Sequence, residues 1–263
     1  MTLTSSEILR HNLHAWNWAA RHGHRWSMPV DEAVIDRARK GILELHLTPT
    51  KQIPASWIQN IAQKKLLGLA SAGGQQGPIL AAAGARVTIV DLSPEQLKQD
   101  QICCKKFGLK IATIQSDAAD LSMFEPASFD LILNPVSNCF FPNLSTVWRE
   151  CARVLKPGGL LLYGFINPVA YQFDYEEANG GHYHLKYHAP YSDHESLSKE
   201  EKTRFIYPEA PLEFGHSLSD QISCLLHEGF VVEDLYEDNW GDERGLDKFF
   251  PSFIAIKARR VSI

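Results

Sequence analysis

A single carboxylate, Asp91, follows the second of two apolar segments, residues 66–69 and 86–90, that flank a turn of small residues with Gly73 and Gly74. Glycine lets the backbone approach a ligand closely. In a unit of strand, turn, helix and strand, the acid after the second strand accepts hydrogen bonds from ribose hydroxyls. The pattern therefore predicts a nucleotide-binding site in which Asp91 holds the ribose.

The turn lacks the glycines of two common phosphate-binding loops. A nicotinamide-dependent dehydrogenase has G-x-G-x-x-G after its first strand, and the residues in register here are Ala70, Ala72 and Gly74. No Gly-Lys-Ser or Gly-Lys-Thr follows a glycine-rich stretch, so no P-loop is present. These substitutions disfavour pyrophosphate binding, although a nicotinamide-dependent oxidoreductase stays an alternative at this point.

The elements that must position this turn alternate from residue 64 onward, which predicts a parallel sheet covered by helices on both faces. We expect strands at residues 66–69, 86–90, 110–115, 129–133, 159–165, 230–236 and 252–258. Apolar periodicity predicts helices at residues 94–107, 144–155 and 219–227, with two more in residues 1–50. Residues 169–215 are rich in Tyr, His, Pro and acids without periodicity, which predicts an insertion.

Composition limits the partners that we expect. The formal charge of −5 and the absence of a long basic run argue against a nucleic-acid partner. Five cysteines without paired spacing predict reduced thiols in a cytoplasmic protein. No window is long and apolar enough to span a bilayer, and the N-terminus lacks the apolar core of a signal peptide. We expect a monomer or a homodimer with no membrane partner.

Three further motifs appear in order after the turn: Asp117 in QSDAADL, the pair Phe129 and Asp130, and RVLKPGG at residues 153–159. In this order and spacing the chain resembles the class I S-adenosylmethionine-dependent methyltransferases, over residues 66–167 and again over residues 219–258. The resemblance implies a Rossmann-like α/β fold with a seven-stranded, mostly parallel sheet. It also implies a helical lid at residues 1–50, a methyltransferase domain at residues 51–263 with its insertion after the fifth strand, and S-adenosyl-L-homocysteine as product.

The resemblance also implies which residues bind the cofactor. Asp91, with Leu92 beside it, matches the acid that bonds the ribose, a charge-assisted contact. Asp117 matches the acid that bonds the adenine amino group, followed by Ala118, and Asn134 faces the amino-acid part of the cofactor or the substrate. The turn itself would line the methionine part through Ala70, Ser71, Ala72, Gly73, Gly74 and Gln75.

Three positions depart from the family pattern. Gly68 stands where the family has an acid in the first strand, and Ala70 and Ala72 stand where it has glycines. We interpret the segment as a variant loop, while a catalytically degenerate S-adenosylmethionine-binding protein stays an alternative.

The insertion supplies the candidates for acceptor chemistry. A base near the acceptor would take its proton, and His182, Tyr183 and His184 are the residues of suitable type. Asn138, Tyr171 and Tyr187 are the predicted acceptor contacts, since an aromatic, enclosed pocket suits a small molecule. The spacing of the histidines permits a metal site, but no Cys or acid stands at a matching distance, so we expect no metal. A nucleic-acid or protein methyltransferase is the remaining alternative.

Overall fold

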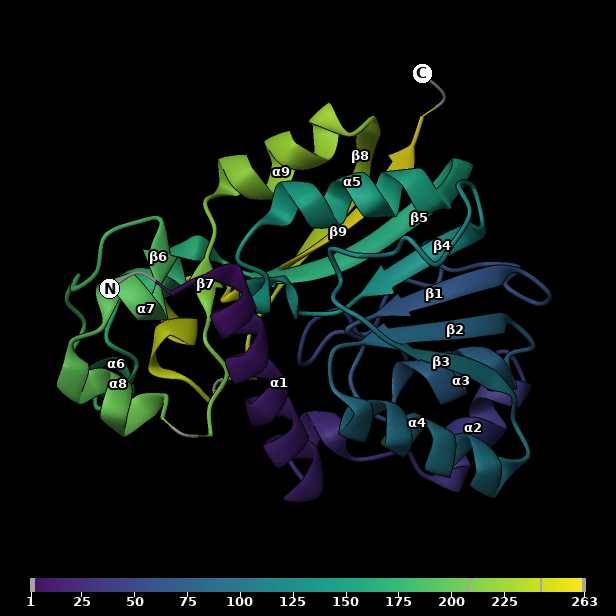
Figure 1. The fold of residues 1–263 in the computed structure, drawn as a ribbon, viewed down its shortest axis with the longest axis horizontal. Helices are drawn as coiled ribbons and strands as arrows, with labels where there is room; N and C mark the ends of the chain where they lie inside the picture. The colour runs from purple at the N-terminus through teal and green to yellow at the C-terminus, as the bar shows by residue number, and fades with distance from the viewer. Residues whose placement is uncertain (1–2, 208, 242, 262–263) are drawn as a thin grey trace.

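The computed structural model describes residues 3–207, 209–241 and 243–261. Within them, one sheet contains seven strands in the order β3-β2-β1-β4-β5-β9-β8 (Figure 1). β9 pairs antiparallel with both of its neighbours, and the other pairs are parallel. The strands are β1 Lys65–Leu69, β2 Arg86–Asp91, β3 Ile111–Gln115, β4 Phe129–Asn134, β5 Leu155–Ile166, β8 Phe230–Asp238 and β9 Phe253–Arg260. The predicted Rossmann-like fold is confirmed.

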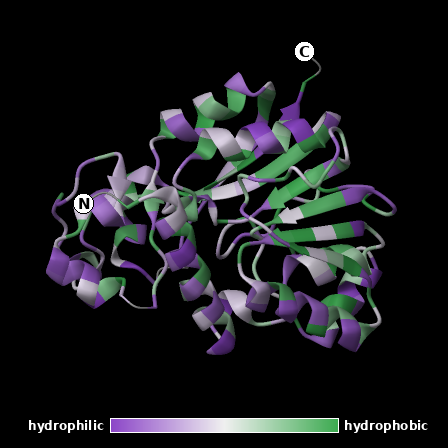
Figure 2. Ribbon diagram, in the orientation of Figure 1, coloured by the Kyte–Doolittle hydropathy of each residue, from purple (hydrophilic) through white to green (hydrophobic). Residues whose placement is uncertain are grey.

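Helices cover both faces of the sheet, because successive strand residues point to opposite sides. In β1, Leu66 packs in the core under α2 (Glu32–Arg39), α3 (Gln76–Ala82) and α4 (Pro94–Phe107). Its neighbour Leu67 packs in the other core, under α5 (Leu144–Val154) and α9 (Leu218–His227). Figure 2 shows hydrophobic residues concentrated along the strands. The strand order reverses between β1 and β4, which opens a crevice at the carboxyl ends of the strands.

The N-terminal helix α1 (Ser5–Arg21) lies between the sheet and the segment that follows β5 (Figure 1). A capping box of Thr4 and Glu7 starts the helix. Its buried Asn12 donates to the Leu212 carbonyl and accepts from the Leu212 N–H, at 3.2 and 2.8 Å. A short helix, η1 (Arg25–Ser27), and then α2 follow. The role of residues 1–50 as a lid stays a prediction.

The segment after β5 forms its own small body beside the sheet, as Figure 1 shows. It contains η3 Pro168–Gln172, α6 Tyr175–Asn179, β6 Tyr191–Ser192, α7 Asp193–Ser196, α8 Lys199–Phe205 and β7 Phe214–Gly215. β6 and β7 pair antiparallel, a pairing that the sequence does not predict. Two more short helices are η2 Asn138–Phe140, after β4, and η4 Gly245–Lys248. Among the described residues, no helix is long and apolar enough to cross a membrane.

Candidate active site

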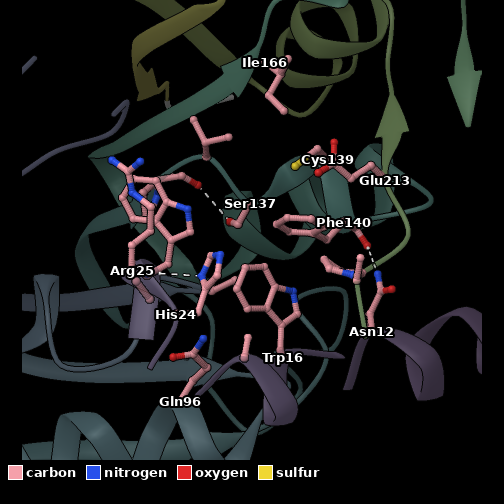
Figure 3. A pocket seen from close by; sticks show the side chains of 18 of the residues that line it. Asn12, Trp16, His24, Arg25, Gln96, Ser137, Cys139, Phe140, Ile166 and Glu213 are labelled. Atoms are coloured by element: carbon pink, nitrogen blue, oxygen red, sulfur yellow. Dashed lines mark hydrogen bonds between the residues drawn. The ribbon is translucent and has the colours of Figure 1, made fainter. Parts of the chain in front are cut away.

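The carboxyl ends of β1, β2 and β4 open into a cavity of about 750 Å³. Its wall combines residues at strand ends with side chains of α1 and η1 and with residues of the segment after β5. Figure 3 shows Gln96 and His24 toward one side of this cavity and Cys139 and Glu213 toward the other, with Trp16 between them. The cavity therefore joins the predicted nucleotide site to the segment after β5.

Most of the predicted cofactor residues line this cavity. They are Ala70, Ala72, Gln75, Asp91, Leu92, Asp117 and Ala118. Three residues of the turn lie behind its surface. Ser71 is fully buried, the Gly73 N–H donates to the Trp26 carbonyl at 3.0 Å, and the Gly74 carbonyl accepts from the Val30 N–H at 2.9 Å. The structure thus brings together most of the residues that we expect to bind the cofactor, and their contacts with it stay predictions.

Both alanines in the turn adopt left-handed backbone conformations. Ala70 has φ of 45° and Ala72 has φ of 66°. An L-residue with a Cβ is disfavoured there by about 1–2 kcal/mol, which glycine avoids. The turn therefore follows a path suited to glycine even though alanine stands at both positions.

A side chain at position 68 of β1 would compete for space with two neighbouring side chains. A Cβ added at Gly68 would lie 2.5 Å from Cδ1 of Ile89 and 2.6 Å from the Ser71 hydroxyl oxygen. The Ser71 hydroxyl is buried and has no hydrogen-bond partner among the described residues. Ser71 thus occupies the space next to the strand that a side chain at position 68 would need.

Asp91 lies at the end of β2 and lines the cavity. One carboxylate oxygen accepts from the Ser93 N–H at 2.8 Å. Burial raises the pKa of Asp91 to about 6, and the Ser93 N–H opposes this rise only in part. The carboxylate makes no ion pair within the described residues, so it has lone pairs available for hydroxyl donors. Asp117 lines the same cavity, and its carboxylate accepts from the Ala119 N–H at 3.1 Å.

Two predicted asparagines lie behind the cavity wall. Asn134 is fully buried and donates to the Leu69 carbonyl and the Ser137 hydroxyl, both at 2.7 Å. It thereby ties the end of β4 to the end of β1. Asn138 is also fully buried, and its amide donates to the Gln221 side chain at 2.8 Å. Neither asparagine lines this cavity or the second one described below.

A second cavity of about 470 Å³ lies next to the first and is lined largely by the segment after β5. Two of the predicted acceptor residues, Tyr171 and Tyr187, line it. Its aromatic wall also includes Phe173, Tyr175, Tyr191, Phe205, Trp240 and Phe253. Because the two cavities share several wall residues, they lie next to each other.

Glu213, which the sequence did not single out, lies in the wall shared by both cavities. The Tyr171 hydroxyl donates to its carboxylate at 2.7 Å. Burial, together with the negative charge of Asp193, raises the pKa of Glu213 to about 7. Asp193 itself accepts from the Tyr191 hydroxyl and from the Glu213 N–H, both at 2.7 Å. The only sequence signal for Glu213 is an acid between the apolar residues Leu212 and Phe214.

The predicted bases of the insertion lie elsewhere. His182, Tyr183 and His184 are exposed and line neither cavity. His184 pairs with Glu177 at 2.8 Å, and Tyr183 packs edge-on against Phe249 with ring centroids 4.6 Å apart. Among the described residues, no group of three or more His, Cys, Asp or Glu side chains is arranged to hold a metal ion.

Comparison with known proteins places this site in a family. Residues 67–163 match the family model of a methyltransferase domain. The chain is 42% identical over 254 residues to the uncharacterized methyltransferase YbaJ of Bacillus subtilis, covering 97% of this chain and 99% of that protein. The chain belongs to the S-adenosylmethionine-dependent methyltransferases. It is an enzyme of the class that the sequence motifs indicate.

Two other relatives resemble parts of this methyltransferase. Ubiquinone biosynthesis O-methyltransferase of Pseudomonas syringae is 33% identical over 123 residues, which cover 45% of this chain and 53% of that protein. The crystal structure of 1,6-didemethyltoxoflavin-N1-methyltransferase of Burkholderia thailandensis, with 1,6-didemethyltoxoflavin and S-adenosylhomocysteine bound, superposes with a TM-score of 0.59. It is 16% identical, covers 100% of this chain and 93% of that chain, and so shows a shared fold.

Proposed function

We propose that this methyltransferase methylates a small molecule held in the second cavity, next to a donor bound at the strand ends of the first. The adjacency of the two cavities carries this proposal, because Glu213 lines both and a donor in one would lie near an acceptor in the other. Volumes of about 750 and 470 Å³ fall in the range of small-molecule sites. The Asn12 contact to Leu212 holds α1 against the segment after β5, an enclosure that a folded macromolecular acceptor would have to open.

The residues at the strand ends suit S-adenosylmethionine. The unpaired Asp91 carboxylate would accept from ribose hydroxyls, and Asp117 would accept from the adenine amino group beside Ala118. The turn from Ala70 to Gln75 would present its backbone to the methionine part. Bound S-adenosylmethionine supplies a methyl group on a sulfonium, whose sulfur keeps the electron pair when the methyl leaves.

Glu213 would take the proton that the acceptor loses. A base works best when its pKa lies near the operating pH, and a pKa of about 7 meets that condition. The Tyr171 hydroxyl bond fixes one carboxylate oxygen and leaves the other free to receive the proton. The apolar walls exclude water, which keeps donor and acceptor in contact.

The test has a binding arm and a rate arm. Calorimetric titration with S-adenosylhomocysteine should give saturable binding, whereas NAD should give none. A panel of phenols, amines and thiols then identifies an acceptor by S-adenosylhomocysteine release. With that acceptor, Glu213→Gln should lower kcat by about 10²- to 10⁴-fold while the Kd of S-adenosylhomocysteine is unchanged. In the active enzyme, kcat should fall as the pH drops through about 7.

His184→Ala in the same assay tests the base predicted from the sequence. If His184 were the base, His184→Ala would lose activity and Glu213→Gln would keep it. We expect the reverse. Failure to bind S-adenosylhomocysteine would overturn the proposed function itself. Turnover of a nucleic acid or protein, with none in the small-molecule panel, would overturn the acceptor class.

A further inference from the structure

Arg244 lies in the wall shared by the two cavities, with its guanidinium over the rings of two aromatic residues. The guanidinium carbon is 3.9 Å from the ring centroid of Trp240 and 4.6 Å from that of Tyr175. Within the part of the chain that the structure describes, the guanidinium makes no hydrogen bond or ion pair. Stacking on two rings holds its plane and donors in a fixed direction.

Most other arginines of the protein have a hydrogen-bond or ion-pair partner for the guanidinium, which Arg244 lacks within the ranges that the structure describes. Arg37, Arg153 and Arg259 pair with glutamates, and most of the rest bond an acid, an amide or a carbonyl. Among the described arginines, the one other without such a partner is Arg149, which is exposed to water. Arg244 is partly buried, and desolvation lowers its pKa against the opposing charges of nearby acids and tyrosines.

Two acids act on the Arg244 charge, Glu213 and Asp247, and neither forms an ion pair with it among the described residues. Glu213 faces the same cavity but accepts from the Tyr171 hydroxyl, and burial raises the pKa of its carboxyl. The Asp247 carboxylate accepts from the Trp240 N–H at 2.9 Å and from the Ser252 hydroxyl at 2.7 Å. A partly buried cation without a hydrogen-bonded anion has lost part of its hydration, so an anion that enters the cavity gains a charge-assisted contact.

We propose that the methyl acceptor carries a carboxylate and that the Arg244 guanidinium binds it in the second cavity. The planar fork of a guanidinium matches a carboxylate with two parallel hydrogen bonds. The aromatic wall around it suits a flat ring, and the volume of about 470 Å³ admits a molecule of that size. This assignment rests on the proposed function, because it takes the second cavity as the acceptor site.

Three probes that share one ring test the charge preference: 3,4-dihydroxybenzoate, catechol and 3,4-dihydroxybenzylamine. Each is titrated by calorimetry into the full-length protein, with and without saturating S-adenosylhomocysteine. The anionic probe should bind at least ~10-fold more tightly than catechol, and the cationic probe should bind most weakly. Arg244→Gln should remove this preference, and Arg244→Lys should keep part of it because the charge remains without the fork.

Arg149→Gln is the matched control, because it removes the same charge from an exposed site and should keep the preference. The proposal fails if the anionic probe has no Arg244-dependent advantage in affinity, or if the cationic probe binds best. Binding of S-adenosylhomocysteine is measured separately on every variant. If the wild-type protein does not bind S-adenosylhomocysteine, the proposed function is refuted. If Arg244→Gln binds S-adenosylhomocysteine with the wild-type Kd, the change concerns the acceptor site alone.

Discussion

Replacing Asp91 by asparagine should separate the folding cost of this residue from its role in binding. Burial raises the pKa of Asp91 from 3.8 to about 6, a rise of roughly two, and each pKa unit corresponds to about 1.4 kcal/mol. Keeping Asp91 ionised at pH 7.5 therefore costs the ligand-free protein about 3 kcal/mol of folding free energy. Because the folded state holds the proton more tightly, this cost is absent below pH 3.8 and is complete above about pH 6.

Asp91→Asn removes the charge and keeps an oxygen for the Ser93 N–H. We expect the free energy of unfolding at pH 7.5 to rise by roughly 1–3 kcal/mol, part of the gain being lost to the buried amide. At pH 4 the difference between variant and wild type should nearly vanish. The affinity for S-adenosylhomocysteine should instead fall by about 1.5–3 kcal/mol, the contribution of a hydrogen bond to a charged group. Urea unfolding at both pH values and calorimetry measure the two effects.

Asp130→Asn is the control, because its effect on the free energy of unfolding should have the opposite sign. Desolvation alone would raise the pKa of Asp130, but its contacts with Lys156 and with the Lys65 N–H outweigh it and lower the pKa. That variant should be less stable than wild type at neutral pH, and the loss should shrink as the pH falls through the carboxyl range. If Asp91→Asn is also destabilised at pH 7.5, or binds S-adenosylhomocysteine like wild type, the reasoning on Asp91 is wrong.

Three further predictions concern the strained turn, the space around Gly68 and the contact of α1 with Leu212. Ala70→Gly should raise the free energy of unfolding, measured by urea unfolding, by about 0.5–1 kcal/mol, because it removes the left-handed strain of the alanine. Ala127→Gly, at φ of 54°, is the control and should show the same gain without changing S-adenosylhomocysteine affinity. Gly68→Ala should cost about 1–3 kcal/mol in the same experiment, because its Cβ overlaps two neighbours, and a neutral result would contradict the steric account. Asn12→Leu should cost about 1–3 kcal/mol by leaving the Leu212 N–H unpaired, and hydrogen exchange at Leu212 should accelerate.

The sequence predicts the sheet and its helices well because their signals are local. The predicted helix at residues 94–107 is α4, with the same bounds. Ser93 caps its N-terminus by accepting from the Gln96 N–H, Pro94 occupies the first turn, and Gly108 ends it with φ of 68°. Each of these signals depends on a few neighbouring residues, so no knowledge of tertiary contacts is needed to read them.

The acceptor end of the site could not be predicted in this way. Glu213 and Arg244 line the same two cavities although they come from different segments of the chain. Selection by residue type favoured His182 and His184 as bases, yet both side chains lie on the surface. The residue type tells which reactions a side chain can take part in. Whether the side chain is buried beside a cavity, and whether its charge lacks a partner, is seen only in the folded chain.

The two alanines of the turn after β1 also bear on whether the chain is a catalytically degenerate member of its family. Ala70 and Ala72 have relaxed conformations open to them, so the left-handed path must be imposed by contacts. The Ala70 N–H donates to the Val90 carbonyl at 2.8 Å, and the Gly73 N–H donates to the Trp26 carbonyl at 3.0 Å. The N-terminal segment thus helps hold the path of the turn despite its missing glycines. The turn thus keeps its left-handed path at the end of β1 although alanine stands at both positions. The substitutions change the residues of the turn and remove the acid expected at position 68, and they leave the path of the backbone in place.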